Sequence, residues 1–106
     1  MPQNTELKSI ENKIARIKRE LQTIEIMRPG SLTMQYKNPG EKKGAYYQLS
    51  YTLDMKSHTD YVRKDSVDDV KKQIEAYKRF RDLTKEWVLL SIKYSKSQIA
   101  LSEKKK

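Results

Sequence analysis

The sequence predicts an α+β protein: a long antiparallel helical hairpin, coiled-coil-like in its spacing, with a small two- or three-stranded antiparallel β-meander inserted at its tip. Towards both ends of the chain, apolar residues recur at alternating steps of three and four, which is typical of paired helices. Between these stretches, apolar and polar residues alternate as they do in a half-buried strand. The patterns follow one another in the order helix, strands, helix.

The first helix is predicted at residues 5–27. Its apolar stripe has a strict 3-4-3-4-3 spacing, and charged residues of both signs fill the positions between. The stripe consists of Leu7, Ile10, Ile14, Ile17, Leu21 and Ile24. Pro29 disfavours helical geometry in the residue before it, and Gly30 is a second helix breaker, so the helix should end before this pair.

A β segment is predicted at residues 31–63. Its best strand is 45–53, where one face would carry Tyr47, Leu49, Tyr51 and Leu53 and the other face Tyr46, Gln48, Ser50 and Thr52. Residues 31–36 and 57–62 can flank this strand, because both are β-prone and are separated from it by turn-forming residues.

The second helix is predicted at residues 66–102, and its apolar stripe is irregular at one place. The stripe consists of Val67, Val70, Ile74, Tyr77, Phe80, Leu83, Trp87, Leu90, Tyr94 and Leu101. Around Tyr77 and Phe80, consecutive steps of three interrupt the alternation, which shifts the stripe around the helix. We therefore expect residues 67–77 to cover the sheet and residues 80–101 to pair with the first helix.

A single domain is predicted over residues 1–103, followed by a basic tail at 104–106. A chain of 106 residues has room for one modest core. A lone pair of helices buries each apolar stripe on one side only, and a second copy that completes a four-helix bundle would cover the rest. A homodimer formed through the helices is therefore expected.

The charge of the chain favours a polyanionic partner. The formal net charge of +9 comes from 23 Lys and Arg against 14 Asp and Glu, as is common in nucleic-acid-binding proteins. No run of about 18 apolar residues exists to span a bilayer, so no membrane partner is expected. The N-terminal residues lack the pattern of a signal peptide, which predicts a cytoplasmic protein.

The sequence contains no recognisable catalytic or metal-binding pattern. With no cysteine and a single histidine, His58, it cannot form a thiolate site or an imidazole cluster. It also has no phosphate-binding glycine loop and no nucleophile motif. We therefore expect neither an enzyme nor a cofactor.

Most tyrosines of the chain fall in the β segment. Tyr47 and Tyr51 can pack beneath the second helix, which is the simpler explanation for this enrichment. The opposite face of residues 45–53 would be exposed among Lys and Arg, which suits DNA or RNA, bound in a groove or by stacking on unpaired bases. The candidate nucleic-acid-binding residues are Arg28, Lys37, Lys42, Lys43, Tyr46, Gln48, Lys56, Arg63 and Lys64.

A second hypothesis assigns the function to the helices. The coiled coil would then be an interaction module that engages a protein partner, as a subunit or an inhibitor of a larger complex, which could itself contain nucleic acid.

A resemblance to a known family rests on residues 27–36 (MRPGSLTMQY) and 44–51 (GAYYQLSY), with support from 61–62, 77–83 and Trp87. These blocks resemble an uncharacterised family of small prokaryotic proteins, a domain of unknown function that is often encoded near transposases and other mobile elements. The resemblance implies a mobile-element or phage context and no reaction. Many members carry a cysteine cluster, which implies a metal knuckle, where this chain has the basic loop 37–43 instead.

Overall fold

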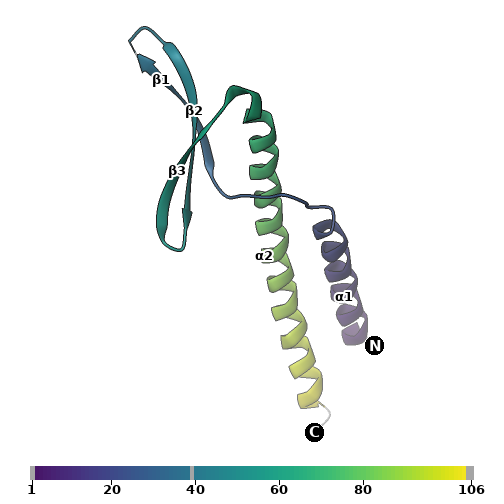
Figure 1. The fold of residues 1–106 in the computed structure, drawn as a ribbon. Coiled ribbons are helices and arrows are strands. Elements are labelled where there is room, and N and C mark those ends of the chain that lie inside the picture. The colour runs from purple at the N-terminus through teal and green to yellow at the C-terminus, as the bar shows by residue number, and fades with distance from the viewer. Residues whose placement is uncertain (1, 39, 105–106) are drawn as a thin grey trace. The chain divides into compact units, whose positions relative to one another are not determined.

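The described part of the chain folds into two α-helices and a three-stranded sheet, in the order helix, sheet, helix (Figure 1). The computed structural model describes residues 2–38 and 40–104. The elements are α1 (Pro2–Leu21), β1 (Ser31–Asn38), β2 (Lys43–Leu53), β3 (Lys56–Val62), the 3-10 helix η1 (Lys64–Ser66) and α2 (Val67–Lys104). The α+β class predicted from the sequence is confirmed. Lys104 ends α2, and the rest of the predicted tail lies outside the described residues.

Helix α1 begins and ends earlier than the predicted helix 5–27. It begins at Pro2, because proline is tolerated in the first turn of a helix, where N–H groups lack helical acceptors. It ends at Leu21, two residues before Thr23. The hydroxyl and the backbone N–H of Thr23 both donate to the Glu20 carbonyl, at 2.6 and 3.1 Å. These short-range bonds tighten the last turn. The prediction placed the end too late because it relied on the distant Pro29.

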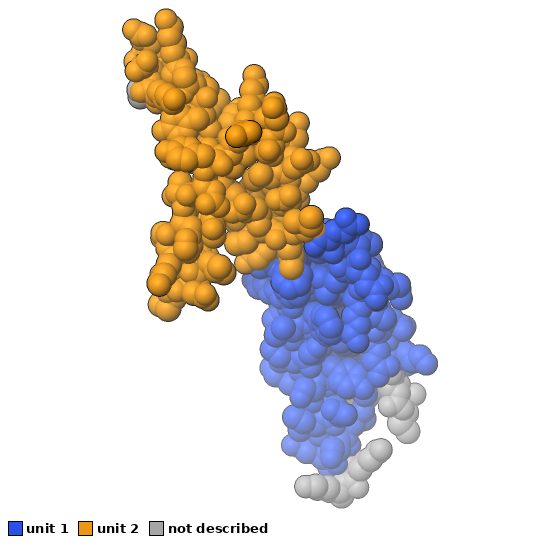
Figure 2. All heavy atoms as spheres, viewed as in Figure 1, with its two compact units in different colours: residues 1–25, 79–106 blue, residues 26–78 orange. Residues whose placement is uncertain are grey.

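The chain divides into two compact units, coloured separately in Figure 2. Unit 1 comprises residues 1–25 and 79–106, and unit 2 comprises residues 26–78. The border lies inside α2, next to the place where consecutive steps of three interrupt the apolar stripe. The predicted division of α2 between the sheet and the first helix is thus confirmed, whereas the domain boundaries 1–103 stay a prediction.

In unit 1, α1 pairs with residues 79–104 of α2. Arg79 Nη1 donates to Thr23 Oγ1 at 3.2 Å, Lys18 Nζ lies 5.2 Å from the Trp87 ring centroid, and the Tyr94 hydroxyl donates to Glu11 Oε1 at 2.9 Å. Because the partners ascend along one segment and descend along the other, the two segments run antiparallel. The hydrogen bond to Glu11 and the charge of its carboxylate raise the pKa of Tyr94.

The predicted stripe residues are those that the helix pairing covers. Ile10, Ile17 and Leu83 are buried, at 2%, 4% and 9% exposure. The half-buried stripe residues of unit 1 are Leu7, Ile14, Leu21, Ile24, Phe80, Trp87, Leu90, Tyr94 and Leu101. The pairing therefore covers most of the stripe only in part. No helix among the described residues has the length and apolar character needed to cross a membrane.

In unit 2, the strands form an antiparallel sheet with the order β1-β2-β3, so the predicted meander has three strands. The turn between β2 and β3 contains only Asp54 and Met55, and both have positive φ, 52° and 65°. This geometry is that of a type I′ hairpin turn, which matches the twist of the strands it joins. It fixes the register that pairs Leu53 with Lys56.

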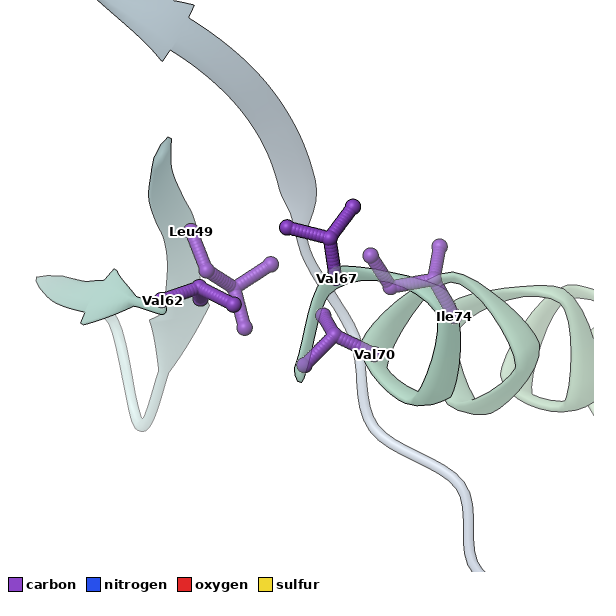
Figure 3. Packing of buried hydrophobic residues seen from close by; sticks show 5 residues of the cluster. All are labelled: Leu49, Val62, Val67, Val70 and Ile74. Carbon is purple, nitrogen blue, oxygen red and sulfur yellow. The ribbon is translucent and has the colours of Figure 1, made fainter. Parts of the chain in front are cut away.

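The core of unit 2 lies between the sheet and the first turns of α2 (Figure 3). Leu49 of β2 is 0% exposed, and its side chain and that of Val62 face α2 in the figure. The buried cluster consists of Leu49, Val62, Val67, Val70 and Ile74. Tyr47 and Tyr51 pack against this cluster, which confirms the core role predicted for them.

Candidate nucleic-acid interface

The register places alternate residues of all three strands on the face of the sheet opposite to Leu49. This surface, the polar face, consists of Ser31, Thr33, Gln35, Tyr46, Gln48, Ser50, Thr52, Ser57, Thr59 and Tyr61. Each of these residues carries a hydroxyl or an amide, and all are exposed except the half-buried Tyr46 and Gln48. The polar face can therefore exchange hydrogen bonds with a ligand without presenting a carboxylate to it.

Two tyrosines from neighbouring strands stand together on the polar face. The ring centroids of Tyr46 and Tyr61 are 5.7 Å apart, and the ring planes are inclined at 56°. Tyr61 keeps 77% of its surface exposed, so much of its ring is open to a ligand. Next to the pair lies a hollow of about 500 Å³, the tyrosine hollow, lined by Met34, Ala45, Tyr46, Tyr47, Tyr61, Val62, Arg63 and Lys64.

Five predicted site residues lie towards the same end of the sheet, where β1 ends, β2 begins and β3 ends. Strand β3 ends opposite Tyr47, about 13 Å short of Lys43 in the β1–β2 hairpin, and Arg63 follows directly. This basic end consists of Lys37, Lys42, Lys43, Arg63 and Lys64. The Lys37 stem lies over Gly44, where an added Cβ would come within 3.0 Å of Lys37 Cβ. Glu41 Oε2 lies 3.8 Å from Lys43 Nζ. Both side chains are well exposed, so water and salt screen this ion pair strongly.

The other predicted site residues are more dispersed. Tyr46 lies beside the basic end, and Gln48 lies between Thr33 and Tyr61 in the middle of the polar face. Lys56 begins β3, whose seven residues place it about 20 Å from the basic end. The structure therefore separates Lys56 from the other lysines of the predicted site.

Arg28 is held by contacts within unit 2. Its Nη2 donates to Asp60 Oδ2 at 3.0 Å, and its guanidinium carbon lies 5.0 Å from the Tyr51 ring centroid. Its backbone N–H donates to the Gln73 carbonyl at 3.2 Å. A phosphate would have to compete with Asp60 for this guanidinium. The structure thus gives Arg28 a role in fastening the segment before β1 to the sheet and to α2.

The exposed tyrosine of the site, Tyr61, and the polar residues contributed by β1 are not among the residues predicted from the sequence. Alternation within residues 45–53 predicts the polar residues of one strand, whereas the face extends over three strands. The signal was present in the spacing of Ser31, Thr33 and Gln35 and in that of Ser57, Thr59 and Tyr61. Recognising it required the register between strands.

Within residues 2–38 and 40–104, no three His, Asp or Glu side chains come together in a way that could hold a metal ion. The basic loop therefore brings no ligand cluster with it in the part of the chain that the structure describes.

Comparisons with known proteins identify a family but no function. Searches among curated proteins and among solved structures found no match. The family described as "Domain of unknown function (DUF6788)" matches residues 7–72, more than half of the chain. The match includes most of α1 and ends before Tyr77, whereas the resemblance noted in the sequence began at Met27. The mobile-element context and the cysteine cluster stay predictions. The chain belongs to this DUF6788 family of domains of unknown function.

Proposed function

We propose that this protein is a small nucleic-acid-binding accessory protein that acts in the cytoplasm for a mobile element, a phage or its host. The proposal rests on one observation: the five cationic side chains of the basic end adjoin a sheet face that carries no carboxylate. Residues 28–64 contain seven bases and three acids, so this segment is positively charged as a whole. Lysine and arginine neutralise phosphates, while neighbouring hydroxyls and amides can hydrogen-bond to bases or sugars.

The test of this proposal is the salt dependence of binding. We expect Lys42→Glu, Lys43→Glu and Arg63→Glu, combined in one variant, to weaken binding to DNA or RNA. We also expect the slope of log K against log salt concentration to become shallower by about 2 to 3, because each lost phosphate contact releases one counterion fewer. Fluorescence anisotropy with a labelled oligonucleotide, at several salt concentrations, measures both quantities.

The matched control reverses three exposed lysines of unit 1, Lys8, Lys13 and Lys93. Each reversal removes two charge units, so both triple variants carry +3 in place of +9. The control should keep most of the slope, because its lysines lie outside the basic end. If both triple variants lose affinity and slope equally, the loss is due to net charge and not to the basic end. Salt-independent binding by the unmodified protein would rule out the proposal.

A second candidate function, self-association through α2, is favoured by a different observation. One side of α2 carries a stripe that is free of charge over about 22 Å, and its apolar members Val88, Ile92 and Ile99 are 57%, 46% and 55% exposed. The outer stripe consists of Thr84, Val88, Ser91, Ile92, Ser95 and Ile99, and most of it lines a hollow of about 660 Å³. The outer stripe borders the one that faces α1, because Trp87, whose ring lies near Lys18 of α1, lines the same hollow together with Lys96.

The partner that fits the outer stripe is a second copy of α2 in antiparallel orientation. The small Ser95 of one copy can then receive Ile92 of the other, while Val88 meets Ile99. The antiparallel arrangement also brings Lys85 of each copy near Glu103 of the other, whereas a parallel arrangement would bring like charges together. A single helix face of this length is smaller than the roughly 800 Å² per partner of a stable complex. We therefore expect a weak dimer with a micromolar dissociation constant.

Cysteine cross-linking tests this dimer, because the chain has no cysteine of its own. We expect a mixture of the Ile92→Cys and Ser95→Cys variants to form a mixed disulfide faster than either variant forms one alone, because antiparallel copies bring these two positions within disulfide range. Mass spectrometry under non-reducing conditions identifies the products. Faster cross-linking of each variant with itself indicates parallel helices. A Lys13→Cys variant supplies the background rate, and rates no higher than this background would contradict the dimer.

A dimer formed through the outer stripe of α2 is compatible with nucleic-acid binding by the basic end of each copy. We propose that the two helices form a hairpin with the sheet at its tip, as the connectivity of the chain favours. Two copies would then offer two basic ends to one nucleic acid, and the second contact would benefit from a high effective concentration. If tip charges prove dispensable for activity while changes on the helices abolish it, the interaction-module hypothesis is the better one.

A further inference from the structure

The tyrosine hollow is lined by both aromatic and cationic side chains, and one class of ligand can bind to both. Tyr46 and Tyr61 contribute aromatic rings from the polar face, and Arg63 and Lys64 contribute two cations. Tyr47 also lines the hollow, but its side chain belongs to the opposite face of β2, where it packs against the core cluster. Its volume of about 500 Å³ lies within the range of small-molecule sites. All the lining residues belong to unit 2, from β1, β2, β3 and the segment that follows β3.

The chemistry of these walls matches a nucleotide. A flat base gains stacking energy from an aromatic ring, and its phosphate gains charge-assisted hydrogen bonds from arginine and lysine. The lining contains no acid, so nothing in the hollow opposes an anion. Tyr61 supplies the most exposed ring, and the register places the Gln48 amide directly beside it, where it can reach the edge of a stacked base.

A base in a duplex cannot use such a wall, because its two faces are covered by the neighbouring base pairs. We infer that the tyrosine hollow binds one unpaired nucleotide of a single-stranded nucleic acid, with the base on Tyr61 and the phosphate at Arg63 and Lys64. This inference rests on the proposed function and adds to it the class of nucleic acid. The basic end then holds the phosphates on either side of the bound nucleotide.

The experiment compares a single-stranded oligonucleotide with a duplex of the same length, both labelled and measured by fluorescence anisotropy. The Tyr61→Leu variant should bind the single strand about 5- to 150-fold more weakly, which corresponds to the loss of one base stacked on an aromatic ring. Its binding to the duplex should stay unchanged. The Tyr61→Phe variant keeps the ring and should bind the single strand as tightly as the unmodified protein does.

Two controls keep the result interpretable. Tyr61 is 77% exposed, so its loss leaves the core intact, and Tyr61→Thr provides a second truncation with high β-propensity if the leucine variant folds poorly. Tyr36→Leu removes a tyrosine of β1 that does not line the hollow and should leave binding unchanged.

The outcomes separate this inference from the proposed function. If Tyr61→Leu binds the single strand as tightly as Tyr36→Leu while reversal of the basic end abolishes binding, stacking in the hollow is disproved and nucleic-acid binding stands. An equal loss on single strand and duplex would also contradict an unpaired base. If neither oligonucleotide binds the unmodified protein, the proposed function itself fails.

Discussion

Replacing Leu49 with alanine is expected to lower the free energy of unfolding by about 2 to 5 kcal/mol, the usual cost of truncating a buried leucine. Leu49 is 0% exposed and belongs to the cluster that joins the sheet to the first turns of α2. The truncation both removes buried apolar surface and leaves a cavity. Because small proteins are stable by only about 5 to 15 kcal/mol, a large share of the stability would be lost. Urea denaturation followed by circular dichroism measures this change.

Leu53 provides the control for this prediction. It lies in the same strand and on the same face as Leu49, but it is 56% exposed. The Leu53→Ala variant should change the free energy of unfolding by less than about 1 kcal/mol, since surface substitutions rarely do more. Similar costs for the two leucines would mean that the cluster around Leu49 does not stabilise the sheet.

Replacing Gly30 with alanine is expected to cost about 2 to 4 kcal/mol through strain and overpacking together. Gly30 has φ of 145°, a conformation that residues with a Cβ atom rarely adopt. An added Cβ would also lie 2.5 Å from Leu49 Cδ1 and 3.3 Å from the Ser50 carbonyl oxygen. The same urea titration would show the loss as a lower midpoint.

Gly40 is the matched glycine for this substitution. A Cβ added there would meet nothing within 4 Å. The Gly40→Ala variant should therefore unfold within about 0.5 kcal/mol of the unmodified protein. If Gly30→Ala proved equally harmless, the close approach of the chain to Leu49 could not be a requirement of the fold.

The helices could be predicted from the sequence because their apolar stripes repeat over many turns. The same periodicity located the change of partner along α2, since a shift of the stripe is visible in the spacing of Tyr77 and Phe80. The end of α1 could not be predicted in this way. It depends on the competition of the Thr23 hydroxyl for the Glu20 carbonyl, which is a local contact without a repeating pattern.

The candidate site was predicted less completely than the helices. Alternation within β2 correctly placed Tyr46 and Gln48 opposite to Leu49. Tyr61 was missed because its position depends on the register of β3, which is set by a two-residue turn with Met55 at positive φ, where glycine is usual. Arg28 was assigned to the ligand because its carboxylate partner, Asp60, is 32 residues away in the sequence.

The border inside α2 constrains how this helix can change in length during evolution. One residue inserted between Tyr77 and Phe80 would rotate everything after it by about 100° relative to the first turns of α2. Val67, Val70 and Ile74 would still face the sheet, but Leu83 would turn away from α1. An insertion of seven residues would rotate the helix by only about 20° and keep both faces in use. Relatives of this protein should therefore differ in this part of α2 by whole heptads, and single-residue insertions should be confined to the loops.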